Sequence, residues 1–166
     1  KQQEAVAACV EFFTAKRKKS ETWNGLAIEP TGFGKSLLIS NIVERVDEPF
    51  LIFQPNREIL EQNLRKFRDY GFEPSVYSAG MGSRDVGQIT LITIGSVASA
   101  SGEKRRRANK AELFGEFSNI IVDEAHLCNS KAGGYADFFN DMDERVKILG
   151  LTATPWRLQS NGYGTQ

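Results

Sequence analysis

Apolar residues along this chain alternate between helical spacing and short continuous runs. Apolar side chains three to four positions apart predict amphipathic helices, because those positions share one helix face. This spacing predicts a helix over residues 2–18, a second beginning at Lys35 and a third after the turn at Asn56. In the third helix, Glu61 and Arg65 have the spacing of an i,i+4 ion pair.

Apolar runs of strand length lie between and after these helices. The first run, at residues 26–28, is closed by Pro30 and predicts a buried strand. Further strands are predicted at residues 50–53, 75–78, 89–94, 119–122 and 146–149. Continuous apolar strands separated by helices predict a mostly parallel sheet with helices on both faces. We therefore expect a doubly wound α/β domain, in which ligands bind at the carboxyl ends of the strands.

Composition narrows the class of protein. The chain has 166 residues, with 21 Lys plus Arg, 21 Asp plus Glu and a formal net charge of zero, and this length fits one domain. Two cysteines, Cys9 and Cys128, and a single histidine are too few for a disulfide framework or a four-ligand zinc site, so we expect reduced thiols. No apolar stretch approaches the roughly 18 residues of a membrane span, and the first residues are too polar for a signal peptide. These features predict an intracellular protein without membrane contact.

The first candidate site follows the first predicted strand. Phosphate binding requires backbone N–H groups at a helix N-terminus, glycine where a Cβ would obstruct, and a lysine for the phosphate charge. Gly32, Gly34 and Lys35 supply these parts, and the hydroxyl of Ser36 can ligate Mg²⁺. Glu29 stands where the general phosphate-loop pattern has glycine. The alternative is therefore a glycine-rich turn with an incidental lysine.

The second candidate site ends the strand predicted at residues 119–122. Asp123 and Glu124 follow that strand directly, and His126 lies two residues further on. A nucleotide hydrolase needs one carboxylate to hold Mg²⁺ and a second group to orient or deprotonate the attacking water. Asp123 suits the metal role, and Glu124 suits the base role because a strand end holds it in place. An acidic turn beside a surface histidine is the alternative for this pair alone, and the phosphate loop upstream favours the nucleotide site.

Three segments together resemble one known family. Residues 32–36 (GFGKS), 123–126 (DEAH) and 151–155 (LTATP) resemble motifs I, II and III of superfamily 2 helicases in their DEAH-box spelling. Motif I of that family commonly lacks the first glycine, which accounts for Glu29. The resemblance covers essentially the whole chain.

Three further segments extend the resemblance. Residues 1–6, 55–62 and 93–96 are similar to the Q motif, motif Ia and motif Ib of the same family. The amino-acid sequence of residues 149–158 is most similar to that of RadD-like bacterial DNA repair helicases. Similar sequences occur in XPB-type helicases and in the motor subunits of restriction enzymes.

The resemblance implies a RecA-like P-loop NTPase fold that uses ATP and Mg²⁺. It implies that Lys35 contacts the β and γ phosphates, that Ser36 and Asp123 hold Mg²⁺, and that Glu124 activates water. The implied ATP-binding residues are Gln2, which reads adenine, and Thr31, Gly32, Phe33, Gly34, Lys35 and Ser36. The implied coupling residues, which relay nucleotide state to the strand-binding face, are His126, Thr152 and Thr154. For the two threonines the alternative is a strand that ends at a proline, with hydroxyls that satisfy turn backbone.

Nucleic-acid contacts are expected at three positions that follow predicted strands. Tracking of a single strand needs hydroxyl, backbone N–H and arginine contacts to successive phosphates, and it needs no code for bases. Arg57, Thr93 and Ser96 meet this description. Basic runs at residues 16–19 and 104–107 are the other candidates, although such runs usually form solvated faces. We expect the second run to lie in an exposed loop at residues 101–110.

The sequence thus predicts a helicase ATP-binding domain over residues 1–158, with residues 159–166 starting a linker to a second RecA-like domain. We expect this domain to bind nucleic acid, DNA rather than RNA, and to couple ATP hydrolysis to movement along it. Alone it should be monomeric and poorly active, since in this family the second domain supplies an arginine finger. One alternative is a non-catalytic nucleotide-dependent nucleic-acid-binding module. Another is the motor domain of a restriction enzyme that translocates without unwinding.

Overall fold

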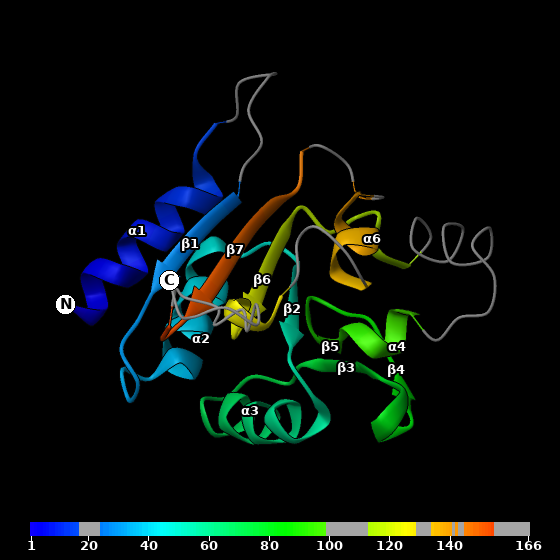
Figure 1. The fold of residues 1–166 in the computed structure, drawn as a ribbon. Helices are drawn as coiled ribbons and strands as arrows, with labels where there is room; N and C mark the ends of the chain where they lie inside the picture. The colour runs from blue at the N-terminus through cyan, green and yellow to red at the C-terminus, as the bar shows by residue number, and fades with distance from the viewer. Residues whose placement is uncertain (17–23, 99–112, 129–133, 141, 143–144, 155–166) are drawn as a thin grey trace, which may run out of the picture.

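The computed structural model describes residues 1–16, 24–98, 113–128, 134–140, 142 and 145–154 (Figure 1). In the described chain one sheet has the strand order β1-β7-β6-β2-β5-β3-β4. Every neighbouring pair is parallel except β3 and β4, which are antiparallel at one edge. The strands are β1 Asn24–Ile28, β2 Phe50–Gln54, β3 Ser75–Ser78, β4 Ser83–Arg84, β5 Ile89–Thr93, β6 Asn119–Asp123 and β7 Lys147–Thr152.

Helices cover both faces of this sheet (Figure 1). Helices α1 (Gln2–Thr14), α2 (Lys35–Val46) and α3 (Arg57–Asp69) contribute to one apolar cluster, while α4 (Ile94–Ala98) and α6 (Gly134–Asn140) contribute to a second. Two short 3₁₀ turns, η1 (Ala79–Met81) and η2 (Ala125–Leu127), follow β3 and β6.

Strand β2 shows how one strand serves both clusters. Phe50 and Ile52 belong to the cluster with α1, α2 and α3, whereas Leu51 and Phe53 belong to the cluster with α4 and α6. Successive side chains of a strand point to opposite faces, so a strand buried on both sides must be apolar throughout. This arrangement confirms the predicted doubly wound, mostly parallel α/β fold.

Strand β1 differs from the prediction. The run at residues 26–28 predicts a buried strand, but the side chains of Leu26 and Ile28 are 55 % and 54 % exposed. The reason is the strand order, which places β1 at the sheet edge with β7 as its only described neighbour. Gly25 and Ala27, on the opposite face, are half-buried, and Gly25 lies close to Phe12 of α1. One face of β1 is therefore packed and the other is open to solvent.

Helix α1 and strand β7 end at other residues than the sequence predicts. Helix α1 ends at Thr14 rather than near residue 18, because Ala15 takes an extended backbone. Lys147, at the start of β7, donates from Nζ to the carbonyl oxygens of Phe13 and Ala15, both at 2.6 Å. A cation on the last carbonyls of a helix favours a stop at that point. Strand β7 continues to Thr152 instead of ending at residue 149, so its carboxyl end lies level with that of β6.

The predicted ion pair in α3 also changes. Glu61 pairs with Arg57, one turn earlier, with 2.7 Å between Arg57 Nε and Glu61 Oε1. Arg65 instead donates to the backbone carbonyl of Glu61 at 3.3 Å. Both spacings are four residues, and the rotamer of Glu61 decides between them. The expected loop at residues 101–110 and most of the basic run 16–19 lie outside the described residues.

Cys9 is buried and Cys128 is half-buried, and no disulfide bond joins the two residues. Burial, with a further contribution from the charge of Glu29, raises the pKa of Cys9 to about 11, so this thiol stays protonated near neutral pH. Among the described helices, none is long and apolar enough to cross a membrane.

Candidate nucleotide site

The loop between β1 and α2 has the backbone that a phosphate site requires. Gly32 and Gly34 have φ angles of 85° and 83°, in the left-handed region that favours glycine. Gly34 is the N-cap residue of α2, so that helix begins at Lys35 and places Ser36, 7 % exposed, in its first turn. The first turn of a helix has N–H groups without intrahelical partners and the positive end of the helix dipole. The terminus is therefore a suitable anion site.

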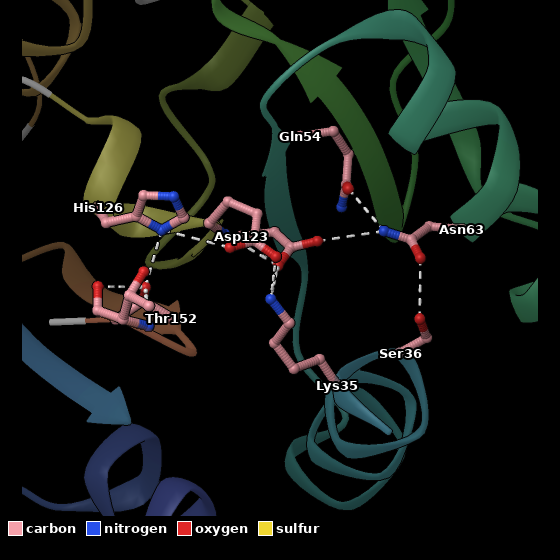
Figure 2. A network of polar contacts seen from close by, with 9 residues as sticks. Lys35, Ser36, Gln54, Asn63, Asp123, His126 and Thr152 are labelled. Atoms are coloured by element: carbon pink, nitrogen blue, oxygen red, sulfur yellow. Dashed lines mark hydrogen bonds and ion pairs between the residues drawn. The ribbon is translucent and has the colours of Figure 1, made fainter. Parts of the chain in front are cut away.

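Two carboxylates lie opposite this helix terminus. Strand β6 ends at Asp123, and Glu124 follows it. Lys35 Nζ forms an ion pair with Glu124 Oε1 and lies 3.7 Å from Asp123 Oδ1 (Figure 2). The structure thus brings together the lysine of the phosphate loop and the carboxylates of the second candidate site, although they are far apart in the sequence.

Glu124 takes an unusual backbone conformation at this point. Its φ and ψ are 51° and 50°, in the left-handed region, where a residue with a side chain costs on the order of 1–2 kcal/mol. Its carboxylate lies between Lys35 and His126, with 3.3 Å between His126 Nδ1 and Glu124 Oε2. Strain of this kind persists where the surroundings determine the conformation, and it clusters at functional sites.

Asp123 is the most buried carboxylate of the site, at 4 % exposed. Burial raises its pKa above the usual aspartate range. Lys35, the N–H of Glu124 at 2.9 Å and the amide of Asn63 act in the opposite direction, because each favours the charged carboxylate. The ionisation of Asp123 therefore depends on these three partners.

Asn63 is a site residue that motif reasoning missed. It lies on α3, is 5 % exposed and contacts side chains from three other elements (Figure 2). Its Oδ1 accepts from Ser36 Oγ at 2.8 Å, and its Nδ2 donates to Asp123 Oδ2 at 3.2 Å and to Gln54 Oε1 at 2.7 Å. The available signal was a polar residue on the apolar face of a helix, between Leu60 and Leu64.

The three residues expected to couple nucleotide and strand binding lie together at the ends of β6 and β7. His126 Nδ1 is 2.9 Å from Thr152 Oγ1 (Figure 2). Thr152 Oγ1 also donates to the carbonyl of Thr154 at 2.9 Å and accepts from its N–H at 3.1 Å. This contact depends on the extension of β7 to Thr152, so the hydroxyls both satisfy turn backbone and reach the histidine.

Gln2, the expected adenine reader, lies against the phosphate loop. Its Nε2 donates to the carbonyl oxygen of Phe33 at 3.2 Å. The first turn of α1 and the loop before α2 are thereby joined. Thr31 lies in the exposed part of that loop and Phe33 is half-buried.

The three expected nucleic-acid contacts do not converge in the same way. Arg57 lies at the start of α3 with 61 % of its side chain exposed, and pairs with Glu61. Thr93 and Ser96 have hydroxyl oxygens 2.6 Å apart, and Ser96 Oγ accepts from the N–H of Ala79 at 2.9 Å. Ser96 is 5 % exposed. Arg57 is therefore open to a ligand, while the Ser96 hydroxyl connects α4 to η1.

The oxygen donors at the phosphate loop suit Mg²⁺. This ion prefers oxygen ligands and is usually bound by one or two carboxylates together with substrate phosphates. Ser36 and Asp123 offer a hydroxyl and a carboxylate that share one hydrogen-bond partner, Asn63. Within the described part of the chain, no cluster of three or more His, Cys, Asp and Glu could hold a metal by itself. The donor set fits an ion that arrives with a nucleotide.

Comparison with known proteins defines the class. The family described as type III restriction enzyme, res subunit, matches residues 1–157, and the chain belongs to it. This membership confirms the resemblance to the first RecA-like domain of superfamily 2 helicases.

Two relatives match about four fifths of the chain. The chain is 30 % identical over 134 residues to the DNA 3'-5' translocase XPB2 of Sulfurisphaera tokodaii, covering 80 % of this chain and 27 % of that protein. It is 27 % identical over 137 residues to a 51.5 kDa protein of a Lactococcus phage, covering 81 % of this chain and 25 % of that protein. The chain thus spans about a quarter of the length of these relatives.

A solved structure shares the fold. The UvsW helicase from bacteriophage T4 superimposes with a TM-score of 0.64 at 19 % identity, over 92 % of this chain and 51 % of that one. At this identity the likeness concerns the fold, and it supports the RecA-like assignment of the sheet.

Proposed function

We propose that this chain is the ATP-binding domain of an ATP-dependent superfamily 2 helicase or translocase that couples ATP hydrolysis to movement on DNA. The observation that carries the proposal is the contact of Lys35, at the N-terminus of α2, with Asp123 and Glu124 at the end of β6. A lysine for phosphate, a carboxylate for metal and a carboxylate for water then lie together at the carboxyl end of strand β6. Family membership and the XPB2 relative support DNA as the nucleic acid.

Each side chain has a role in the proposed reaction. Lys35 and the N–H groups of the first turn of α2 bind the phosphates, and Ser36 and Asp123 hold the magnesium ion. That ion supplies charge stabilisation to the transferring phosphoryl group. Glu124 orients and deprotonates the attacking water. To do so it must leave the ion pair that it forms with Lys35, and phosphate oxygens are the ligand that can replace it there.

The proposed enzyme needs a second RecA-like domain. Phosphoryl transfer depends on positioning and charge stabilisation, and an arginine finger contributes about 10³–10⁵ in rate. In this proposal the finger comes from the second domain, linked through residues 159–166, which lie outside the described residues. The isolated 166-residue chain is then a monomer that binds nucleotide weakly and hydrolyses it slowly.

A second candidate is the motor of a restriction enzyme that translocates without unwinding. The description of the matching family favours it, since it names the res subunit of a type III restriction enzyme. Both candidates use the same nucleotide site. Strand displacement separates them from each other, because a translocase without unwinding moves along duplex DNA and leaves its strands paired.

The replacement Glu124→Gln in the full-length protein tests the shared part of the proposal. An amide cannot take the proton of the attacking water, so we expect hydrolysis to fall by about 10²–10⁴-fold with ATP still bound. Steady-state ATPase assays and nucleotide titration measure the two quantities. Glu44→Gln, at an exposed position near the end of α2, is the matched control and should leave both unchanged. Unaltered hydrolysis in Glu124→Gln contradicts the role proposed for Glu124. A parent protein that binds ATP without hydrolysing it supports the non-catalytic binding module instead.

A further inference from the structure

Asn63 occupies a position that the pattern of α3 reserves for an apolar residue. Leu60, Leu64 and Phe67 share its buried face at helical spacing. A buried amide costs free energy unless it is hydrogen-bonded, and this one has three side-chain partners. Its presence in the core is therefore explained by those partners and not by packing.

The partners determine how the amide is turned. An ionised carboxylate only accepts hydrogen bonds, so the group facing Asp123 must be Nδ2. Nδ2 has two hydrogens, and the second is accepted by Gln54 Oε1 at 2.7 Å. Oδ1 therefore faces Ser36, whose hydroxyl must donate to it. The orientation follows from the chemistry of the partners.

This orientation prepares Ser36 and Asp123 for a metal ion. A hydroxyl that ligates a cation uses an oxygen lone pair, and its proton must be accepted by another group. Asn63 Oδ1 accepts that proton, while Asn63 Nδ2 holds the Oδ2 atom of Asp123. We propose that Asn63 is a positioning residue that holds Ser36 and Asp123 in the orientation that binds Mg²⁺–nucleotide. The inference rests on the proposed function, since it takes these two residues as the metal ligands.

Gln54 supports the same arrangement at a cost. It lies at the end of β2 and is fully buried, and its Nε2 has no hydrogen-bond partner among the described residues. An unpaired buried donor destabilises a fold. The compensating contact of this side chain is Oε1, which accepts from Asn63 Nδ2. Because Asp123 turns Nδ2 of Asn63 toward both acceptors, Gln54 must present its oxygen here, and its unpaired Nε2 is the result.

The arrangement also joins the metal ligands to α3. This helix begins at Arg57, the residue expected to contact the nucleic acid, and Asn56 caps it by accepting from the N–H of Ile59 at 2.9 Å. Asn63 lies less than two turns from Arg57 on the same helix. Asn63 is thus a hydrogen-bonded link from Ser36 and Asp123 to the helix that carries Arg57.

The test compares nucleotide affinity with and without magnesium in the replacement Asn63→Asp. The new carboxylate still accepts from Ser36 but repels Asp123 and cannot donate to it or to Gln54. We expect the affinity for a fluorescent ADP analogue in Mg²⁺ to fall by about 10–100-fold, the usual effect of losing a partner of a metal ligand. The affinity in excess EDTA should not change, because the phosphate loop remains intact.

Two matched variants separate this role from a merely structural one. Asn41→Asp makes the same replacement on α2, where the amide donates to the carbonyl of Leu37 in its own helix, and it should change neither affinity. Asn63→Leu removes all three side-chain hydrogen bonds without adding charge, and it should lose the magnesium-dependent affinity as well. In a Ser36→Ala background the effect of Asn63→Asp should shrink, because the two residues act through one contact.

The outcomes distinguish this inference from the proposed function. If the parent protein binds the ADP analogue equally well in Mg²⁺ and EDTA, the assumed metal site is wrong. This result contradicts both the role of Asn63 and the proposed function. If the parent depends on magnesium and Asn63→Asp retains that dependence, the role of Asn63 alone is overturned. An equal loss in Mg²⁺ and EDTA for both Asn63 variants also overturns it, since that result indicates general damage to the fold.

Discussion

Two groups of predicted site residues differ in how their side chains make contact. In the nucleotide group, residues from separate elements meet each other, as Lys35 of α2 meets Asp123 and Glu124 at the end of β6. In the strand-binding group, Arg57 makes contacts separate from those of Thr93 and Ser96. Arg57 pairs within its own helix, and the Ser96 hydroxyl bonds to Thr93 and to the N–H of Ala79.

The difference follows from what each site would bind. A phosphate chain with its metal is compact, so its ligands must converge before it arrives. A nucleic-acid strand is long, so its contacts are spread over a surface and each must be exposed. Arg57 is exposed and Ser96 is buried. Of these two residues, only Arg57 is placed to meet a strand directly, and Ser96 supports the neighbouring backbone.

The largest effect of the three variants that test this comparison is expected for Lys35→Ala. The ammonium group is a charged partner for phosphate, and such bonds contribute about 1.5–3 kcal/mol, so nucleotide affinity should fall by about 10–100-fold. Asp123 and Glu124 would then face each other without a cation, and the pKa of Asp123 would rise further. Calorimetric titration with ATP measures the loss. Lys66→Ala, on the exposed side of α3, is the control, and equal affinity of Lys35→Ala and parent would break the comparison.

An intermediate effect is expected for Arg57→Ala. The side chain is exposed, and losing one phosphate contact should weaken strand binding at all sequences and reduce the salt slope by about 1. Nucleotide affinity should stay the same, because Arg57 has no described contact with the nucleotide group. Stability should change by less than about 1 kcal/mol, since an exposed ion pair contributes little.

The measurement for Arg57→Ala is a salt titration of single-stranded DNA binding. Arg65→Ala provides the matched control, because Arg65 is an exposed arginine on the same helix. Identical strand affinities of Arg57→Ala and parent would remove Arg57 from the strand-binding group.

The smallest effect is expected for Ser96→Ala. Removing the hydroxyl deprives the Ala79 N–H and the Thr93 hydroxyl of a partner, so unfolding free energy should fall by about 1 kcal/mol. Strand affinity should not change if the hydroxyl supports the fold alone. Urea denaturation and the same DNA titration check both statements. A loss of strand affinity without a loss of stability would show that Ser96 belongs with Arg57.

The sequence signals for the nucleotide group are local, and the structure brings its predicted residues Lys35, Asp123 and Glu124 together. A left-handed backbone at Gly32 and Gly34 favours glycine. A carboxylate at the end of an apolar strand indicates the carboxyl end of the sheet, where ligands bind. Asn63 gave only a weak signal, since its partners Ser36 and Asp123 lie 27 and 60 residues away. The expected roles of Gln2, His126 and the two threonines stay predictions, with positions near the site that agree with them.

The prediction that strand β1 is buried was wrong because burial, like the contacts of Asn63, depends on residues far away in the sequence. An apolar run such as residues 26–28 is compatible with an edge strand or a central one, and only the strand order decides between them. The stop of α1 at Thr14 depends likewise on Lys147, which reaches it from the other end of the chain.

The sequence by itself determined the alternation of helices and strands, the glycine-rich turn before Lys35 and the two carboxylates at the end of β6. These features depend on residues that are neighbours in the chain, through backbone conformation and helix and strand periodicity. The tertiary structure decided that β1 is an edge, that β7 carries Thr152 to His126, and that Asn63 joins Ser36 to Asp123. Each of these depends on which segments are adjacent in space, and that is set by the order and register of the strands.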